Sequence, residues 1–503
     1  MKARLVSIYG RAALYRPRSS FLGRRTRSVL PSRVRALLWR GRTERIFKSS
    51  RNSRLKLAKS PAVPRKKAQC FDAHGMGSSL GLWWFAPVLS GGGYGSEAVA
   101  LLLGLHRASD SSVAVRATHH GDAMDQEHVF GLPSSSREAL EATLRASTPT
   151  AEQAVVVCHS EPGAWHPALY ETSRCPPAGA AVAVGRTMFE TDRLDPEHVK
   201  RLNAMREVWV PTRWGLDTFA RAGVRPEKLR VVPEAVDIDR FDADAVAASP
   251  EFDLEARARR VLGPPLRGGG VRSTKFLSVF KWEARKAPEV LLNAYLDAFT
   301  AEDDVALFLR CDLYHDAATE TRGGDPVSAR IAAFAEARRE KGATRKASPR
   351  VYALPRVPET EMPSAYAAAD AFVLPSRGEG WGRPHVEAMS LGLPVIATNW
   401  SGPTAFMTRE NAYPLAVQDE LVALPEDSHW KTHRWAQPSE DHLRSLLKHV
   451  HASPEEARRK GERAAADVRR RFAPETVARE VTRHVERLAR EWREERARAE
   501  REL

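Results

Sequence analysis

Two glutamates, Glu379 and Glu387, are separated by seven residues in the segment with the clearest chemical signal. An apolar run at residues 371–374 precedes them and predicts a buried strand. A glycine-rich turn follows, and the next segment predicts a helix with Pro384 near its start and Gly392 just past its end. Such a turn aims backbone N–H groups and the positive helix end at one spot, which suits phosphate oxygens. Because carboxylates accept hydrogen bonds from hydroxyls, the segment predicts a site for a phosphate-linked, hydroxyl-rich ligand such as a nucleotide sugar.

The same residues also fit a purely structural role. A glutamate in the first helical turn complements the helix dipole, and a Gly-Glu-Gly segment can be only a turn. The flanking sequence favours the chemical interpretation, because Ala388 and Met389 continue the helix and Leu-Pro-Val-Ile-Ala-Thr at residues 393–398 predicts a strand. In this segment the chain resembles the retaining glycosyltransferases of family 4, whose C-terminal domains carry an E-x7-E signature before an Ala-Met helix and such a strand.

Three cations, Lys281, Arg285 and Lys286, follow the strand that is predicted at residues 276–280. Ligands of open α/β sheets bind at the carboxyl ends of strands, so these cations are placed to meet one. A diphosphate leaving group gains negative charge as the glycosidic bond breaks, and fixed cations stabilise that charge. The resemblance implies that Lys281 and Lys286 hold the diphosphate with Arg285 as a helper, although Ala287 stands where the family usually has glycine. A solvated basic turn is the alternative.

The resemblance implies different roles for the two acids. Glu387 is expected to bind the ribose hydroxyls of the donor, and Glu379 to address the donor sugar during catalysis. The sugar would be transferred with retention by front-face attack, since no side-chain nucleophile is evident. No metal is expected because cations take its place, and the Asp-x-Asp spacing at residues 237–239 is interpreted as a structural turn. The predicted donor-binding set is Lys281, Arg285, Lys286, Gly378, Gly380, Trp381, Gly382 and Glu387.

A glycine-rich run lies between a strand predicted at residues 81–89 and a helix predicted from Ala98. Residues without a Cβ let the backbone approach a ligand closely. The run lacks the spacing of the dinucleotide and P-loop fingerprints, so a flexible turn is the alternative. In the resembled family a glycine-rich loop at this place lines the cleft near the donor phosphates or the acceptor. Its residues are Gly91, Gly92, Gly93, Tyr94 and Gly95.

His159 follows an apolar strand predicted at residues 154–158 and is the catalytic candidate of the N-terminal half. A neutral imidazole there could hydrogen-bond a sugar hydroxyl or the reacting phosphate. The resembled enzymes carry a His-Glu-Pro-like segment here, whereas a histidine satisfied by the backbone is the alternative. The acceptor-side candidates are Glu161, Arg186, Thr187 and Glu190, with Asp122, near His119 and His120, as a weaker one.

Strands and helices alternate along the chain, which argues for parallel sheets. The resemblance implies an α/β fold of the GT-B type, in which two Rossmann-like parallel-sheet domains face a central cleft. A Gly- and Pro-rich segment at residues 263–270 marks their boundary, and residues 207–214 and 231–237 match landmarks that we assign to the interdomain region. The predicted divisions are a basic leader at residues 1–70, an N-terminal acceptor-side domain at 71–262, a C-terminal donor domain at 271–474 and an amphipathic helix at 475–503.

The net charge of +15 comes from the leader. Residues 1–70 carry 21 Lys and Arg and a single acid, Glu44, whereas the other 433 residues carry a net charge of −5. The leader has no apolar run that could span a bilayer, and its Arg-rich, acid-poor composition favours a transit peptide for a chloroplast or mitochondrion, with the organelle import machinery as a partner. The alternatives are a basic arm for nucleic acid or lipid and a start assigned too far upstream, which would leave the protein cytoplasmic or peripheral to a membrane.

The four cysteines, Cys70, Cys158, Cys175 and Cys311, are widely spaced. No C-x-x-C pair or His/Cys cluster indicates a metal site, and no disulfide framework is expected. We therefore interpret all four as buried or incidental thiols.

The sequence thus predicts a metal-independent, retaining hexosyltransferase with a nucleotide-diphosphate sugar as donor and a glycan, lipid or small molecule as acceptor. One alternative is a non-catalytic GT-B protein that binds sugar nucleotides or glycans, but the intact set of charges argues against it. The other is a nucleic-acid-binding protein that uses the basic arm, and the slightly acidic body argues against that partner.

Overall fold

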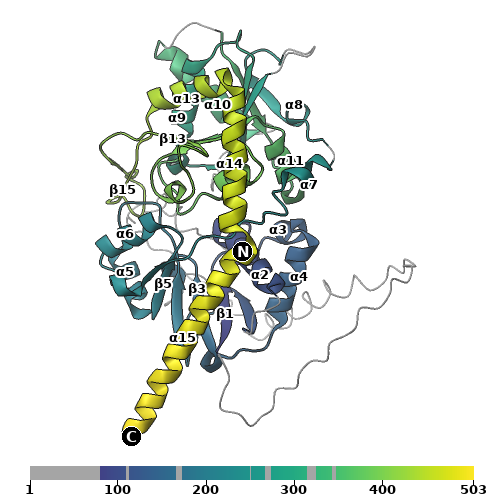
Figure 1. The fold of residues 1–503 in the computed structure, drawn as a ribbon. Coiled ribbons are helices and arrows are strands. Elements are labelled where there is room, and N and C mark those ends of the chain that lie inside the picture. The colour runs from purple at the N-terminus through teal and green to yellow at the C-terminus, as the bar shows by residue number, and fades with distance from the viewer. Residues whose placement is uncertain are drawn as a thin grey trace, which may run out of the picture. The chain divides into compact units, whose positions relative to one another are not determined.

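The computed structural model describes residues 80–108, 113–165, 173–249, 251–266, 273–313, 325–342 and 347–503. These residues belong to one compact unit, which is shown in Figure 1. The leader and Cys70 lie outside the described residues, so the predictions about them are not addressed by the fold.

The first sheet has six strands, and every neighbouring pair is parallel, in the order β2-β1-β3-β4-β5-β6. Parallel strands are covered on both faces, so they read as continuous apolar runs, and all six residues of β3 are buried. The first and third strands lie within a few residues of the strands predicted at residues 81–89 and 154–158. The six strands are β1 (Gly81–Ala86), β2 (Val115–His119), β3 (Ala154–His159), β4 (Val182–Arg186), β5 (Glu207–Val210) and β6 (Leu229–Val231).

The second sheet has seven strands in the order β13-β12-β11-β8-β9-β10-β7. Its bounds are β7 (Arg259–Leu262), β8 (Thr274–Trp282), β9 (Val305–Leu313), β10 (Arg350–Leu354), β11 (Ala371–Leu374), β12 (Val395–Thr398) and β13 (Tyr413–Leu415). Strand β7 pairs antiparallel with β10, and the other pairs are parallel. Because β7 precedes the boundary expected at residues 263–270, the chain enters the second sheet earlier than the composition indicated. A third, two-stranded sheet joins β14 (Val422–Ala423) to β15 (Arg434–Trp435).

α-Helices connect most of the parallel strands. In the described residues, only short 3-10 helices lie between β3 and β4 (Pro162–Ala164) and between β12 and β13 (Gly402–Ala405). The α-helices between strands of the first sheet are α2 (Gly93–Arg107), α3 (Gln126–Gly131), α4 (Ser134–Arg145), α5 (Pro196–Ala204) and α6 (Arg213–Arg221), and α7 (Ala243–Ala247) and α8 (Leu254–Arg257) lead to the second sheet. The remaining helices are α9 (Pro288–Ala298), α10 (Pro326–Glu340), α11 (Met362–Ala367), α12 (Arg383–Ser390), α13 (Glu440–Ala452), α14 (Pro454–Phe472) and α15 (Pro474–Glu502).

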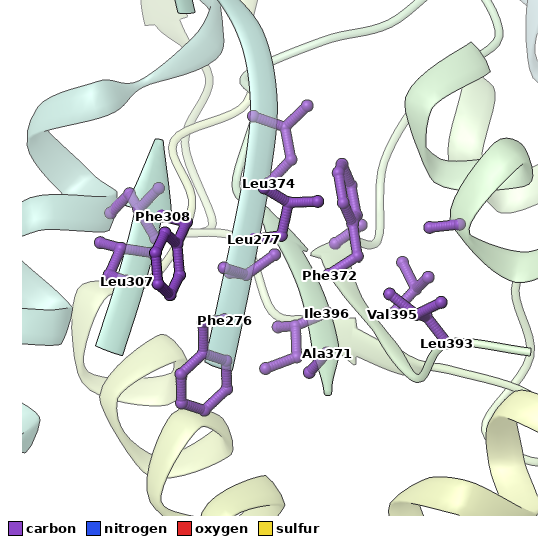
Figure 2. Packing of buried hydrophobic residues seen from close by; sticks show 14 of the residues in the cluster. Phe276, Leu277, Leu307, Phe308, Ala371, Phe372, Leu374, Leu393, Val395 and Ile396 are labelled. Atoms are coloured by element: carbon purple, nitrogen blue, oxygen red, sulfur yellow. The ribbon is translucent and has the colours of Figure 1, made fainter. Parts of the chain in front are cut away.

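Figure 2 shows the core of the second sheet, where Phe276 and Leu277 of β8 lie between Phe308 of β9 and Phe372 of β11. These side chains are fully buried. Burial of an aromatic or aliphatic side chain of this size contributes about 1.5–3 kcal/mol to folding. The core therefore holds β8 and β11 rigidly, and the loops that follow these two strands carry the predicted site residues.

The last two helices cover different domains, as Figure 1 shows in yellow. Helix α14 buries Ala464 and Val468 in the core of the second sheet, whereas α15 buries Val477 and Val481 in the core of the first. The predicted amphipathic helix is thus confirmed, and it packs on α2 of the N-terminal domain. Among the described residues, no helix combines the length and the apolar character that a membrane span requires.

The interpretation of all cysteines as free thiols is wrong for two of them. Cys158 at the end of β3 is bonded to Cys175, seventeen residues further along the chain. The spacing of the two cysteines gives no signature of this pairing, because the pairing depends on which residues the fold brings together. Cys311 is a free, buried thiol, and burial raises its pKa well above the usual value.

Candidate active site

A cavity of about 410 Å³ is lined by the segments that follow strands of both sheets. The first sheet contributes segments after β1, β2, β3 and β4, and the second contributes the ends of β8 and β9 and the turn after β11. Ligands of open α/β sheets bind at these carboxyl ends of strands. The cavity brings together Glu379, Glu387 and the three cations Lys281, Arg285 and Lys286, as the sequence predicted.

Glu379 lies at the centre of a buried ion cluster. Its Oε1 is 2.6 Å from Nζ of Lys286, and its Oε2 is 3.0 Å from Nη1 of Arg285. Despite burial, these cations lower the pKa of Glu379 to about 2, so the carboxylate is ionised at neutral pH. Arg285 also donates to the carbonyl of Gly378 and to Glu283. The cation segment after β8 and the turn after β11 are therefore one bonded unit.

The backbone around Lys286 is held in an unusual conformation. Ala287, the next residue, has φ of +49° and ψ of +51°, in the left-handed region that glycine adopts more readily. This is the position where the resembled family usually has glycine. The conformation ends the short 3-10 helix Ala284–Lys286 and begins α9 directly after it. Lys286 is thereby fixed with its ammonium group inside the cavity.

Glu387 is the fifth residue of α12, on the other side of the same turn. The hydroxyl of Tyr366 donates to its Oε2 at 3.2 Å, and Nη2 of Arg383 lies 3.8 Å from its Oε1. Burial raises the pKa of Glu387. Glycine at position 382 has φ of +117°, which starts the helix immediately after the turn. The two acids thus occupy different environments: cations dominate around Glu379, whereas burial dominates around Glu387 and the guanidinium groups of Arg383 and Arg240 only partly offset it.

The turn after β11 is in close contact with the N-terminal domain. A Cβ on Gly378 would lie 2.1 Å from the carbonyl oxygen of Glu190, and a Cβ on Gly380 would lie 2.4 Å from the side chain of Met188. Any side chain at either position would push these segments apart. Gly378 itself does not line the cavity, so its role is this close packing.

The glycine-rich run also lines the cavity, although helix α2 begins within it at Gly93 and not at Ala98. Gly91, Gly92 and Gly93 contribute to the wall, while a Cβ on Gly95 would collide with the carbonyl of Ser90 at 2.2 Å. The hydroxyl of Tyr94 accepts from the amide of Met188 at 3.3 Å, which ties the run to the segment after β4.

His159 is not brought to the cavity. Its ring is completely buried, with Nδ1 accepting from the indole of Trp84 at 3.0 Å and Nε2 bonded to Glu97 at 3.0 Å. Burial lowers the pKa of His159, so the ring is neutral. Arg186 joins the same network through Glu97 and also donates to the carbonyls of Val232 and Pro233. The polar partners of His159 are side chains of the protein. The histidine therefore neither contacts the cavity nor is satisfied by the backbone, which were the two predicted roles.

The acceptor-side candidates divide into two groups. Glu161 and Glu190 line the cavity, as does the weaker candidate Asp122. Thr187 bonds to Tyr94 at 3.2 Å, and neither it nor Arg186 is part of the cavity wall. These two residues support the wall from behind.

Sequence reasoning missed several lining residues, among them Glu234, Arg383 and Tyr366. Glu234 follows β6 in a segment assigned to the interdomain region, and Nη1 of Arg383 lies 3.4 Å from its carboxylate. Burial raises the pKa of Glu234 well above the usual value. Glu234 could have been predicted from its position after a strand end. The rule that ligands bind at the carboxyl ends of strands had already located Lys281 and Glu379.

Among the described residues, no group of three or more His, Cys, Asp or Glu side chains is arranged to hold a metal ion. Asp237 and Asp239, which have the spacing of a metal motif, do not line the cavity. Asp239 pairs with Arg107 at 2.5 Å, and Asp237 accepts from the amide of Arg240 at 3.2 Å. Both carboxylates have partners that fit a structural turn.

Comparison with known proteins shows what this chain is similar to. Residues 277–427 match the family model described as Glycosyl transferases group 1. The D-inositol 3-phosphate glycosyltransferase of Segniliparus rotundus is 28% identical over 254 residues, which cover 50% of this chain and 45% of the relative. The enzyme of the same name from Corynebacterium jeikeium is 30% identical over 203 residues, or 40% of each chain. The chain therefore spans less than half the length of these curated relatives.

Among solved structures, Anabaena HepE in complex with UDP and glucose superposes with a TM-score of 0.51 at 14% identity, over 81% of this chain and 99% of that one. This likeness concerns the fold, and it agrees with the two sheets of mainly parallel strands. Residues 277–427 are thus similar to the group 1 glycosyltransferases, and the fold is of the GT-B type.

Proposed function

We propose that this protein transfers a hexose-type sugar from a nucleotide-diphosphate sugar to an acceptor, with retention of the anomeric configuration and without a metal ion. The observation that carries the proposal is the cluster in which Lys286 and Arg285 converge on Glu379 beside Lys281 in one cavity. Fixed cations at this place favour a ligand that is doubly anionic and a reaction in which a diphosphate leaves.

The donor would lie across the turn after β11. Lys281 and Lys286 hold the diphosphate, and Glu387 accepts hydrogen bonds from the ribose hydroxyls near Tyr366. Glu379, ionised and next to the cations, accepts from a hydroxyl of the donor sugar. The first turn of α12 adds its positive end to the anionic part of the donor.

Chemistry would proceed on the face of the sugar from which the diphosphate leaves. The acceptor hydroxyl attacks the anomeric carbon, the bond to the diphosphate oxygen breaks, and the acceptor proton passes to that leaving oxygen. Lys286 and Lys281 stabilise the charge that develops on the diphosphate. This route supports retention without a covalent intermediate on the protein, and the buried His159 takes no part in it.

The experiment is a screen of UDP-, GDP- and ADP-linked hexoses for slow hydrolysis without an acceptor, starting with UDP-glucose because HepE binds UDP and glucose. We expect one donor to be hydrolysed, with the released sugar in the donor's anomeric configuration when followed by NMR from the first turnover. Tight binding of a nucleotide sugar without turnover would instead support the non-catalytic alternative. Inverted configuration would contradict the front-face route.

A further inference from the structure

The two halves of the cavity wall differ in charge. The segments of the second sheet contribute both cations and acids. On the N-terminal side, the described lining residues include no Lys, Arg or His. They do include four carboxyl groups, on Asp122, Glu161, Glu190 and Glu234.

Glu161 is the informative member of this set. The residue is 9% exposed, and its Oε1 accepts from the amide of Gly163 at 3.0 Å and is bonded to His198. Its other oxygen, Oε2, is buried without a hydrogen-bond partner. A buried carboxylate oxygen without a donor is costly, and native proteins satisfy nearly all such groups. Glu161 lines the cavity, so a ligand bound there would lie against this carboxyl group.

Glu190 and Asp122 lie where the acidic N-terminal half of the cavity wall meets the cations of the other half. Oε1 of Glu190 lies 3.9 Å from Nη1 of Arg285, at the border with the cations that would hold the donor diphosphate. Asp122 lines the same cavity as Lys281, whose positive charge opposes the rise in the pKa of Asp122 that burial causes. Once a donor diphosphate neutralises these cations, the space in front of the N-terminal half is bounded by acids. A phosphate placed there would meet like charges at short range.

We propose, resting on the proposed function, that the acceptor is a non-anionic molecule whose hydroxyl or ammonium groups donate to Glu161, Glu190 and Asp122. A phosphate on the acceptor is selected against. The name of the curated relatives specifies a phosphorylated acceptor for those enzymes. The acidic wall therefore assigns this chain a different acceptor chemistry within the same fold.

The test compares matched acceptors, using the donor that is hydrolysed fastest in the screen. The pairs are myo-inositol with inositol 3-phosphate, glucose with glucose 6-phosphate, and glycerol with glycerol 3-phosphate. We expect the unphosphorylated member to be glycosylated at least about tenfold faster, because a like charge a few ångströms away costs more than 1.4 kcal/mol. The rates with glucosamine and glucose as acceptors are then compared. This comparison shows whether the carboxyl groups prefer an ammonium or a hydroxyl as hydrogen-bond donor, and a preference for either supports the proposal.

Variants show whether the acidic wall causes the preference. In Glu190→Gln and Asp122→Asn, we expect the ratio of phosphorylated to unphosphorylated turnover to rise several-fold. The ratio is taken within each variant, so a general loss of rate cancels. Faster transfer to a phosphorylated acceptor, or a ratio that neither variant moves, would overturn the proposal. Absence of donor hydrolysis in the wild-type protein would instead count against the proposed function.

Discussion

The Nζ atom of Lys286 lies 2.6 Å from Oε1 of Glu379, and both side chains are buried in the cavity wall. The pair joins segments that are 93 residues apart in the chain. Under the proposed function, Lys286 binds the diphosphate and Glu379 binds the donor sugar. When no donor is bound, the two opposite charges neutralise each other. The cations thus remain in place for the leaving group without large movement, which is the preorganisation that charge stabilisation requires.

Loss of Lys286 should affect both rate and stability. Lys286→Ala should lower turnover on the order of 10²-fold, the scale for loss of one preorganised charge-stabilising group. It should also lower the free energy of unfolding by about 3 kcal/mol, because a buried carboxylate loses one of its two cations. Steady-state kinetics and urea denaturation of the same preparation measure the two effects.

Lys281→Ala is the matched control for stability. Lys281 lines the same cavity but is exposed, so we expect a comparable loss of rate with little change in melting temperature. Near-normal turnover in both lysine variants would place the diphosphate elsewhere.

The buried carboxylate of Glu97 should make the free energy of unfolding depend on pH in the acidic range. Arg186 and His159 oppose the effect of burial and lower its pKa from 4.5 to about 2. Its contribution to stability is therefore complete above about pH 4.5 and is lost as the pH falls toward 2, on the order of 3 kcal/mol in all. The gap in unfolding free energy between the wild type and Glu97→Gln should shrink over this window in urea titrations at pH 3 to 7.

Glu141→Gln provides the control, because Glu141 pairs with Arg145 on the exposed surface of α4 at 3.1 Å. Exposed pairs contribute about 0–1 kcal/mol. A gap for Glu97→Gln that stays constant with pH would contradict the assigned ionisation.

Activity should survive excess EDTA. The cavity offers Lys281, Arg285 and Lys286 to the diphosphate, which is the role that a divalent ion has in metal-dependent transferases. Turnover of the donor identified in the screen is measured with and without chelator. Loss of activity that Mn²⁺ or Mg²⁺ restores would show that the cations are insufficient.

Residues 1–70 should be dispensable for folding and turnover. Their one-sided charge and lack of a core-forming apolar pattern motivate this expectation. A form that lacks them should keep its melting temperature and its rate of donor hydrolysis. A large fall in melting temperature would mean that the leader is part of the fold.

The sequence alone was sufficient to predict the strands that are buried on both faces and the turns that follow these strands. β8 and β11 read as apolar runs, and Lys281 and Glu379 follow from the rule that ligands bind at strand ends. Strand β7 was missed because Arg259 and Arg260 are exposed at a sheet edge and give no apolar pattern.

What the sequence could not predict depends on distant partners. The exclusion of His159 from the cavity follows from Glu97, 62 residues earlier, and from Trp84. The disulfide of Cys158 depends on the fold that brings Cys175 next to it. The unpartnered Oε2 of Glu161 likewise appears only when the side chains around it are placed.

The proposed function depends most on the different roles of Glu387 and Glu379, and calorimetry of nucleoside diphosphates tests these roles directly. UDP, GDP and ADP are titrated into the wild type to identify the base, and the tightest binder is titrated into Glu387→Gln and Glu379→Gln. An interaction made equally in ground and transition states appears in binding, whereas one strengthened in the transition state appears in kcat. We predict that Glu387→Gln weakens nucleotide binding, and that Glu379→Gln binds the nucleotide but turns over the donor slowly. Loss of nucleotide binding in Glu379→Gln together with unchanged binding in Glu387→Gln would contradict the account.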